Sequence, residues 1–466
     1  MPPLIALFIW LVFLLGLLIF DPANEPNTSS ALWIPVIFLF FAGSRLPSQW
    51  LGGQQGMSAQ AFEQGNPLDR VIFSALILLS FGVLISRSLN WGAVIVRNRA
   101  LATFLLFSLL SACWSDFAFV CLKRWIRDCG GYLMVLLILS DPRPLEAVRT
   151  VLRRLSYLLI PLSIVLDKYF PALSRSYDPW TGLSHYAGVT TTKNLLGEVC
   201  VVSGLFFLWD ISMRWPGRHV KRTLRIILID TALLALTLWL LVTAESTTAK
   251  VCVVLGALVI AGANTRFFRR HPALLKALIP GLFCLYLFLD FALGMNGSMA
   301  EAVGKDPTLT DRTKIWAFLL SMHTNPIIGV GYQSFWLGPR LETFWEFSGL
   351  GHINEAHNGY LEAYLELGIV GVSLLVWFLI SSYRSLWRRA RSPGSFALLG
   401  VTLWLALLFY DMSEAGFENT LLWVVFLIGA ITPHERVRDS ARSRYTGRTH
   451  TVTLETSESR RSACQA

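Results

Sequence analysis

The sequence has 466 residues, of which 54% are hydrophobic, 13% aromatic and only 15% charged. Soluble domains carry about 25% charged residues, so this composition excludes a water-soluble enzyme, a disordered chain and a fibrous repeat. The 40 Lys and Arg residues outnumber the 30 Asp and Glu residues, which gives a net charge of +10. Because the basic residues are scattered between apolar stretches, they are typical of the cytoplasmic loops of a polytopic membrane protein and not of a nucleic-acid surface.

The first apolar stretch has no basic segment before it and no small-residue cleavage site after it, so it predicts a retained membrane helix and not a signal peptide. A spanning helix needs about 20 mainly apolar residues. On that basis we predict an all-α polytopic membrane protein with about 12 transmembrane helices. The candidate spans are residues 4–20, 32–43, 71–85, 100–114, 130–140, 155–166, 195–211, 224–243, 251–263, 274–293, 361–382, 396–410 and 420–432.

Basic residues predict which connections face the cytoplasm. Basic residues crowd the segments after residues 211, 263 and 382 and the polar tail 433–466. These four segments alternate correctly with the spans, so all four are expected on the cytoplasmic side. We therefore expect residues 167–194, 244–250, 296–360 and 411–419 to face outward, and the tail to be disordered. Lys123, Arg124 and Arg127 are an exception, because alternation places their loop outside.

Acids within the spans are functional candidates by default, because a charge in hydrocarbon is costly. Asp230 lies inside an otherwise apolar span, whereas Glu198, Asp210 and Asp290 lie near span ends and can reach the interface. Of the four, only Asp230 is hard to explain without a function. The seven cysteines contain no C-x-x-C pair and lie mostly in apolar segments, so neither a disulfide framework nor a zinc site is predicted.

Lys193 and Asn194 begin the span that follows the outward segment 167–194. They are either simple interfacial anchors or the cation and amide of an anion site. Both readings stay open on spacing alone.

The outward insertion before residue 361 carries many aromatic residues, so it is expected to fold. Within it, Arg312, Lys314 and Trp316 begin a predicted helix, and Arg312 shares a face with Trp316 four residues later. A guanidinium offers a bidentate fork suited to phosphate oxygens. Arg312 is therefore a candidate phosphate clamp, with a surface ion pair as the alternative. Tyr332 lies in a glycine-rich turn whose aromatics either sit at the bilayer interface or stack on sugars.

His357 precedes the next span and shares a helical face with Tyr360. Histidine is the commonest general base, so His357 is a candidate for taking a proton from a sugar hydroxyl. The alternative is an interfacial histidine that caps the helix. His352 competes for the same role, and Asn358 is counted with the candidate binding residues.

Four segments together resemble the O-antigen ligase and polymerase superfamily, especially its exopolysaccharide-polymerase-like branch. They are residues 32–45, 188–197, 311–316 with 329–332, and 357–371. The resemblance implies a GT-C-like, metal-independent, inverting glycosyltransferase that moves a glycan from undecaprenyl diphosphate to an acceptor hydroxyl. It also implies that Arg312 binds the diphosphate, that His357 is the periplasmic-loop histidine, and that Lys193 lies where a second cation is expected.

We accordingly predict catalytic roles for His357 and Arg312, and substrate binding by Lys193, Asn194, Lys314, Trp316, Tyr332, Asn358 and Tyr360. No metal or cofactor is expected, and the partners are the lipid-linked oligosaccharide, a glycan or lipid acceptor and membrane lipid. The predicted domains are a transmembrane bundle (1–293), a periplasmic insertion with short helices (294–360), transmembrane helices (361–432) and a basic cytoplasmic tail (433–466). The predicted location is the bacterial inner membrane, with the site facing the periplasm. The alternative function is a transporter or flippase, and a sensor or scaffold is a third possibility.

Overall fold

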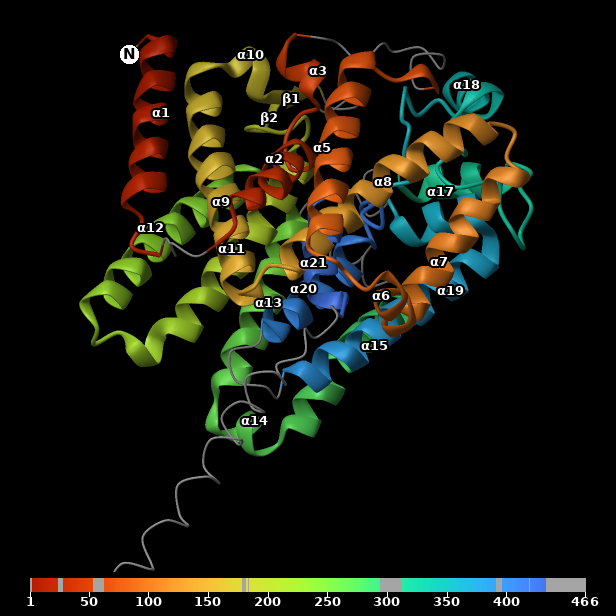
Figure 1. Cartoon of the computed structure of the whole chain (residues 1–466). Helices are drawn as coiled ribbons and strands as arrows, with labels where there is room; N and C mark the ends of the chain where they lie inside the picture. Colours follow the sequence, from red (N-terminus) through yellow and green to blue (C-terminus); the bar gives the residue numbers. More distant parts are fainter. Residues whose placement is uncertain are drawn as a thin grey trace, which may run out of the picture.

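The computed structural model describes residues 2–23, 28–52, 63–177, 182, 184–293, 312–390, 396–418 and 420–432. The regular structure of these residues is helical, apart from an antiparallel hairpin of β1 (Arg175–Tyr177) and β2 (Ser184–Tyr186). This hairpin and the short helix α10 (Pro171–Ser174) lie at one end of the molecule, and α14 (Arg266–Arg270) lies at the other (Figure 1). The predicted disordered tail and the first part of the predicted insertion, residues 294–311, lie outside the described residues.

Seven helices among the described residues are long and apolar enough to cross a membrane. An eighth candidate is the pair α6 (Trp91–Arg97) and α7 (Arg99–Leu110), which is bent by 98°. The prediction of an all-α polytopic membrane protein is thus confirmed, while the count of about 12 spans stays a prediction. The seven are α1 (Pro3–Phe20), α5 (Pro67–Ser86), α11 (Lys193–Arg214), α12 (Lys221–Thr243), α13 (Thr247–Asn264), α15 (Pro272–Leu293) and α19 (Gly359–Arg389).

Three predicted spans are short apolar helices. They are α2 (Trp33–Ala42), α20 (Ala397–Tyr410) and α21 (Leu421–Ala430), and all ten residues of α21 are buried. Helix α20 packs against α11 and α13, and α21 packs against α8. The helices of residues 361–432 therefore share one hydrophobic core with those of residues 1–293.

Two predicted spans are the apolar halves of longer helices, α8 (Ala118–Leu139) and α9 (Pro144–Tyr169). The first half of α8 carries Lys123, Arg124 and Arg127. The prediction that these three residues lie in a loop is wrong. Their charges interrupt the hydropathy, but Leu, Lys and Arg all favour helix, so the helix continues through them.

Helix α19 is broken at Gly368, whose φ of 64° and ψ of −167° are not helical. Residues 326–331 fill the break, because Gly331 N donates to Glu366 O at 2.8 Å and Ile369 N donates to Pro326 O at 2.9 Å. A Cβ on Gly368 would lie 2.3 Å from the carbonyl of Ile327. Glycine at this position permits both the positive φ and the close approach of the two backbones.

The described part of the insertion has its own small core. Helices α17 (Arg312–Ser321) and α18 (Gly338–Phe347) enclose Ile315, Leu319 and Phe344, which are all fully buried. This core packs beside the first turns of α19, through Leu365. One further short helix, α3 (Pro47–Trp50), packs against α5.

Candidate functional site

Three residues that the sequence singled out meet at one carboxylate, that of Glu414. Arg312 Nη2 lies 2.8 Å from Glu414 Oε1, and Asn194 Nδ2 donates to the same oxygen at 2.7 Å. His357 Nδ1 lies 3.6 Å from Glu414 Oε2. His357 also forms an ion pair with Glu355, in which Nδ1 and Oε1 are 2.9 Å apart. We call these five residues the Glu414 cluster.

Each cationic or polar member of the Glu414 cluster comes from the start of a helix. Asn194 is in the first turn of α11, and Arg312 is the first residue of α17. His357 lies two residues before α19, whose N-cap is Asn358. Helix N-termini carry partial positive charge and unpaired backbone N–H groups, and both favour anions. The cluster is thus built where a negatively charged group is stabilised.

Glu414 reaches the cluster because the turn after α20 is anchored on the start of α19. Gly359 N donates to Asp411 O at 2.9 Å, and Gly416 N donates to Asp411 Oδ1 at 2.8 Å. A Cβ on Gly359 would lie 2.0 Å from Asp411 Oδ1, so only glycine allows this contact. Burial holds the pKa of Asp411 well above its ordinary value. The turn therefore has a defined position relative to His357.

His357 is a cation at neutral pH in this arrangement. Burial alone would lower its pKa, but the Glu355 carboxylate and then Glu414 raise the pKa of His357 to about 10. Burial opposes ionisation of Glu355, but the charge of His357 brings the pKa of that carboxyl below its ordinary value. The φ of His357 is 48°, a left-handed conformation that is uncommon outside glycine and concentrates at functional sites.

The outward segments predicted from the charge pattern lie together. Besides the contacts of Glu414, Thr248 Oγ1 and Ser413 Oγ are 2.6 Å apart. Lys193 Nζ lies 3.2 Å from His185 Nε2, and His185 Nδ1 lies 3.2 Å from Glu245 Oε2. Parts of residues 167–194, 244–250, 312–358 and 411–418 are thereby brought to the same region of the molecule.

The other predicted binding residues make contacts that hold the insertion and α19 in place. Trp316 Nε1 donates to Ala356 O at 2.9 Å, and Tyr360 OH donates to Leu408 O at 3.2 Å. Asn358 Oδ1 accepts from the N–H of Tyr360 and so caps α19. Lys314 is exposed on α17. Asn358 directly follows His357, and Trp316 lies one helical turn after Arg312, so these two positions are next to the Glu414 cluster.

Tyr332 and His352 lie elsewhere. Tyr332 OH donates to Asp128 Oδ2 at 2.8 Å, within a second group of polar residues on α8. The ring of His352 packs against Trp345 with 4.8 Å between the centroids. Of the two histidines that competed for one role, only His357 joins Arg312.

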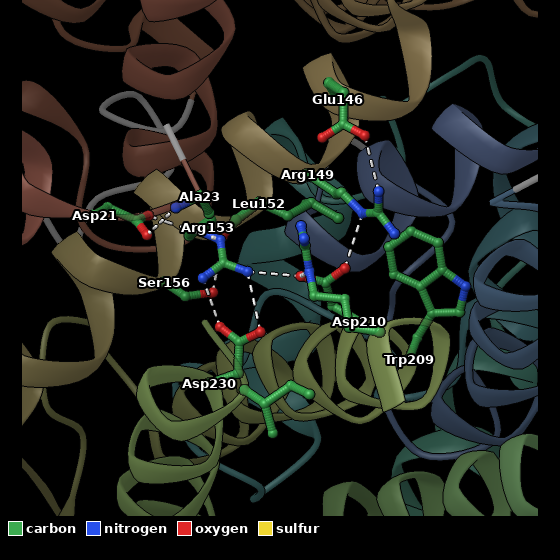
Figure 2. A network of polar contacts seen from close by, with 12 residues as sticks. Asp21, Ala23, Glu146, Arg149, Leu152, Arg153, Ser156, Trp209, Asp210 and Asp230 are labelled. Atoms are coloured by element: carbon green, nitrogen blue, oxygen red, sulfur yellow. Dashed lines mark hydrogen bonds and ion pairs between the residues drawn. The ribbon is translucent and has the colours of Figure 1, made fainter. Parts of the chain in front are cut away.

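The acid Asp230, a functional candidate on sequence grounds, forms part of a closed ion-pair network (Figure 2). Arg153 Nη1 lies 2.6 Å from Asp230 Oδ1, and Arg153 Nη2 lies 2.6 Å from Asp210 Oδ2. Asp21 lies 3.9 Å from Arg153 Nε. Arg149 adds contacts to Glu146 and Asp210, both of 2.8 Å. This Arg153 network joins α9, α11 and α12 and gives Asp230 a structural partner.

Two groups of side chains among the described residues have the ligand spacing of a metal site. They are Glu355, His357 and Glu414, and Glu362, Glu366 and Glu418, each with ligand atoms within 4.8 Å of one another. In the first group His357 lies 2.9 Å from Glu355 Oε1 and 3.6 Å from Glu414 Oε2, as ion pairs. The prediction that no metal is required stays a prediction.

Glu414 and Glu355 were not chosen from the sequence. Glu414 lies 57 positions after His357 in a short polar turn, with no motif around it. The one available signal was the placement of residues 411–419 on the outward side, which made its acid a possible partner for Arg312. Glu355 stood within the segment that contains His357 but was not assigned a role.

Comparisons with known proteins show which family the sequence is similar to. Residues 231–376, which include Arg312 and His357, match the family model described as O-antigen ligase. The chain is also 35% identical over 109 residues to the exopolysaccharide production protein ExoQ of Rhizobium meliloti (strain 1021). That alignment covers 22% of this chain and 25% of the relative, so the chain matches about a quarter of the relative's length. These matches confirm the resemblance to the O-antigen ligase and polymerase superfamily.

Proposed function

We propose that this protein is a membrane glycosyltransferase that moves a glycan from undecaprenyl diphosphate to an acceptor hydroxyl. The observation that carries the proposal is the meeting of Arg312, Asn194 and His357 at Glu414, at the starts of three helices. The O-antigen ligase family match over the segment that contains Arg312 and His357 supports it.

The cations hold the diphosphate. Arg312 supplies a bidentate donor, and the protonated His357 supplies a second charge next to it. Asn194 adds an amide donor, and Lys193 lies one residue away at the same helix start. Donors placed before the reaction stabilise the charge that develops on a leaving group without reorganising, so they act mainly on the transition state.

The reaction needs a base for the acceptor and no strong acid for the diphosphate. The acceptor oxygen attacks the anomeric carbon, the bond from that carbon to the phosphate oxygen breaks, and undecaprenyl diphosphate leaves with the electron pair. A single displacement of this kind inverts the anomeric configuration. The sequence assigns the base to His357, but that imidazole already carries its proton. We propose that the Glu355 carboxylate, which is ionised beside His357, accepts the proton of the acceptor hydroxyl.

The same proposal gives the chain its place in the cell. The basic connections predicted to be cytoplasmic put the Glu414 cluster on the periplasmic face of the bacterial inner membrane, with the C-terminus inside. The fold would be GT-C-like with about 12 spans, counting the short buried helices as parts of spans. The partners are lipid-linked oligosaccharide and a growing glycan or lipid core, and no metal or nucleotide sugar takes part.

The alternative function is a transporter or flippase, which would bind its substrate at broken helices near the middle of the membrane. The break in α19 at Gly368 is the observation that favours it. However, residues 326–331 already satisfy the backbone groups of that break. A filled break offers no free backbone dipoles to a substrate, so we prefer the glycosyltransferase.

The test is polymer formation in a deletion strain complemented with wild-type, Arg312→Ala or His357→Ala protein. We expect both variants to abolish the polymer at normal protein levels in the membrane. The in vitro counterpart uses purified full-length protein in lipid nanodiscs with a defined lipid-diphosphate-linked oligosaccharide. Normal polymer from both variants would refute the site, and uptake of a labelled lipid without glycan transfer would support the alternative.

A further inference from the structure

A second polar region lies beside the Glu414 cluster and encloses a cleft of about 750 Å³. This volume is within the roughly 300–1,000 Å³ range of small-molecule sites. Helices α5 and α8 form one wall, and the first turns of α19 with residues 333–336 and 415–418 form the other. We call it the α8 cleft.

Basic side chains line one side of the α8 cleft and carboxyl groups line the other. Lys123, Arg124 and Arg127 line it from α8. Glu362 and Glu366 of α19 and Glu418 line the facing side, with carboxylate oxygens within 4.8 Å of one another. Such a surface presents hydrogen-bond donors on one side and carboxyl oxygens on the other.

Gln333 joins the two walls. Its Nε2 donates to Asp128 Oδ2 at 2.6 Å and to Glu418 Oε2 at 3.1 Å. Its Oε1 accepts from Arg127 Nη2 at 3.1 Å. The residue has a φ of 49° and is only 4% exposed. A glutamine held from both sides in a left-handed conformation is fixed in the cleft wall, as a residue that contacts a ligand must be.

The α8 cleft is continuous with the Glu414 cluster through Glu355. This carboxylate lines the cleft and also forms the 2.9 Å ion pair with His357. A molecule in the cleft can therefore extend to the atoms that perform the proposed reaction.

A metal ion is a poor occupant of the acidic wall. Glu362 already accepts from Trp336 Nε1 and, at 2.9 Å, from Ala356 N, so both its oxygens are in use. The facing cations of α8 would oppose a further positive charge, whereas hydroxyl groups can donate to the carboxylates and accept from the cations.

We propose that the α8 cleft binds the sugar residues of the oligosaccharide and that Gln333, Glu366 and Glu418 contact their hydroxyl groups. This inference rests on the proposed glycosyltransferase function and names where its glycan lies. The shared chemistry is that of a hydroxyl-rich oligosaccharide, which is either the glycan still on its carrier or the acceptor glycan. Residues of the α8 cleft set specificity, while the Glu414 cluster performs the transfer.

The test compares Glu418→Gln and Gln333→Asn with wild-type full-length protein in nanodiscs. Asparagine tolerates the left-handed conformation but has a shorter reach, which provides a second variant if Glu418→Gln folds poorly. Glu346→Gln is the matched control, because Glu346 is exposed on α18 outside the cleft. Donor and acceptor concentrations are varied separately.

We expect KM for one glycan substrate to rise at least tenfold, with kcat within about threefold of wild type, since about 1.4 kcal/mol of binding corresponds to a factor of ten. A rise in the donor KM assigns the cleft to the carrier-linked glycan, and a rise in the acceptor KM assigns it to the acceptor. Unchanged KM values in both variants, with transfer intact, would overturn the proposal.

A binding measurement separates this proposal from the proposed function. The probe is free oligosaccharide released from the host's own polysaccharide, which lacks the lipid diphosphate. We expect Arg312→Ala to bind it as wild type does, and Glu418→Gln to bind it at least tenfold more weakly. If the variants bind in this pattern but the wild-type protein transfers no glycan, the proposed enzymatic function is refuted and the proposal for the α8 cleft stands. Absence of binding by wild type, together with unchanged KM values, would refute the cleft.

Discussion

Two arginine centres of this protein use the same residue types in opposite ways. Arg153 is 3% exposed and lies among Asp21, Asp210 and Asp230. The Arg312 side chain is 16% exposed and pairs with Glu414, a carboxylate that it shares with His357. The first centre joins α9, α11 and α12 (Figure 2), and the second lies at the starts of α11 and α17 and just before α19.

The difference shows how a structural ion pair is distinguished from a candidate site in a membrane protein. In the Arg153 network the carboxylates of Asp21, Asp210 and Asp230 are buried around a buried guanidinium, so these charges compensate one another in a low dielectric. In the Glu414 cluster two cations share an acid and remain partly accessible, so an incoming anion can replace it. The Arg153 network is expected to affect folding, and the Glu414 cluster to affect turnover.

The largest expected effect concerns the Arg153 network. Arg153→Met leaves Asp230 buried without its cation, and removing one partner of a buried pair costs about 3–5 kcal/mol. We expect little folded protein, measured as membrane level and melting temperature in detergent. Adding Asp230→Leu should restore part of the stability, because Asp210 keeps its contacts with Arg149 and Arg214. Full stability of Arg153→Met alone would contradict this account of the network.

The next largest effect concerns the Glu414 cluster. Removing one preorganised donor costs about 2.7–4 kcal/mol of barrier, which is roughly 100- to 1,000-fold in rate. We expect Arg312→Ala to lower the transfer rate by that factor while the melting temperature stays close to that of wild type. Arg312→Lys should recover only part of the rate, since an ammonium lacks the bidentate fork. If Arg312→Ala lowered the melting temperature and left the transfer rate unchanged, Arg312 would have a structural role like that of Arg153.

A backbone contact links folding and turnover at the Glu414 cluster. Gly359→Ala places a Cβ within 2.0 Å of Asp411 Oδ1 and so displaces the turn that carries Glu414. Overpacking of this kind costs about 1–3 kcal/mol. We expect both the melting temperature and the transfer rate to fall. The matched control is Gly82→Ala in α5, where a Cβ meets nothing within 4 Å and neither quantity should fall.

The smallest expected effect is a shift in pH dependence. The pKa of His357 in the folded protein is about 10, above its ordinary value of about 6.5. The pairing of protonated His357 with its carboxylates therefore contributes fully to the free energy of unfolding below about pH 6.5. This contribution is lost as the pH rises through about 10. In Glu355→Gln we expect the loss to occur at lower pH, because the main charge that raises the pKa is gone.

The measurement is the melting temperature as a function of pH, with histidine NMR signals as a direct readout. His357→Gln removes the titrating group and should flatten the profile in this range. Identical profiles for wild type and Glu355→Gln would show that the carboxylate does not control the imidazole. Protein stability is used here because Glu355 also has a proposed part in the reaction, which would confound a rate.

Much of the fold was predictable, because apolar length determines where membrane helices form. Each predicted span lies in a helix, but α8 and α9 extend far beyond their apolar halves. The break at Gly368 was not predictable, since the apolar pattern runs through it and its cause is a segment about 40 positions earlier in the chain. That Lys123, Arg124 and Arg127 line a cleft was not predictable either, because its other walls come from distant parts of the chain.

Only part of the candidate site was predictable from the sequence. The residue types and the resemblance identified Arg312 and His357, and Asn194 followed from its place at a helix start. Glu414 and Glu355 required coordinates, because nothing in the local sequence of an acid in a polar turn indicates which distant cation it will meet. The structural partner of Asp230 was not predictable for the same reason, since Arg153 is 77 residues away.

The position of Glu414 has a consequence for selectivity. On the proposed function, this carboxylate is a tethered competitor for the place of the diphosphate, always present at the high effective concentration of a group on the same chain. A head group with a single negative charge gains little by displacing it, whereas a diphosphate gains more. When the spent carrier departs, the carboxylate returns to the cations, so each cycle ends with neutralised charges and the carrier is not retained.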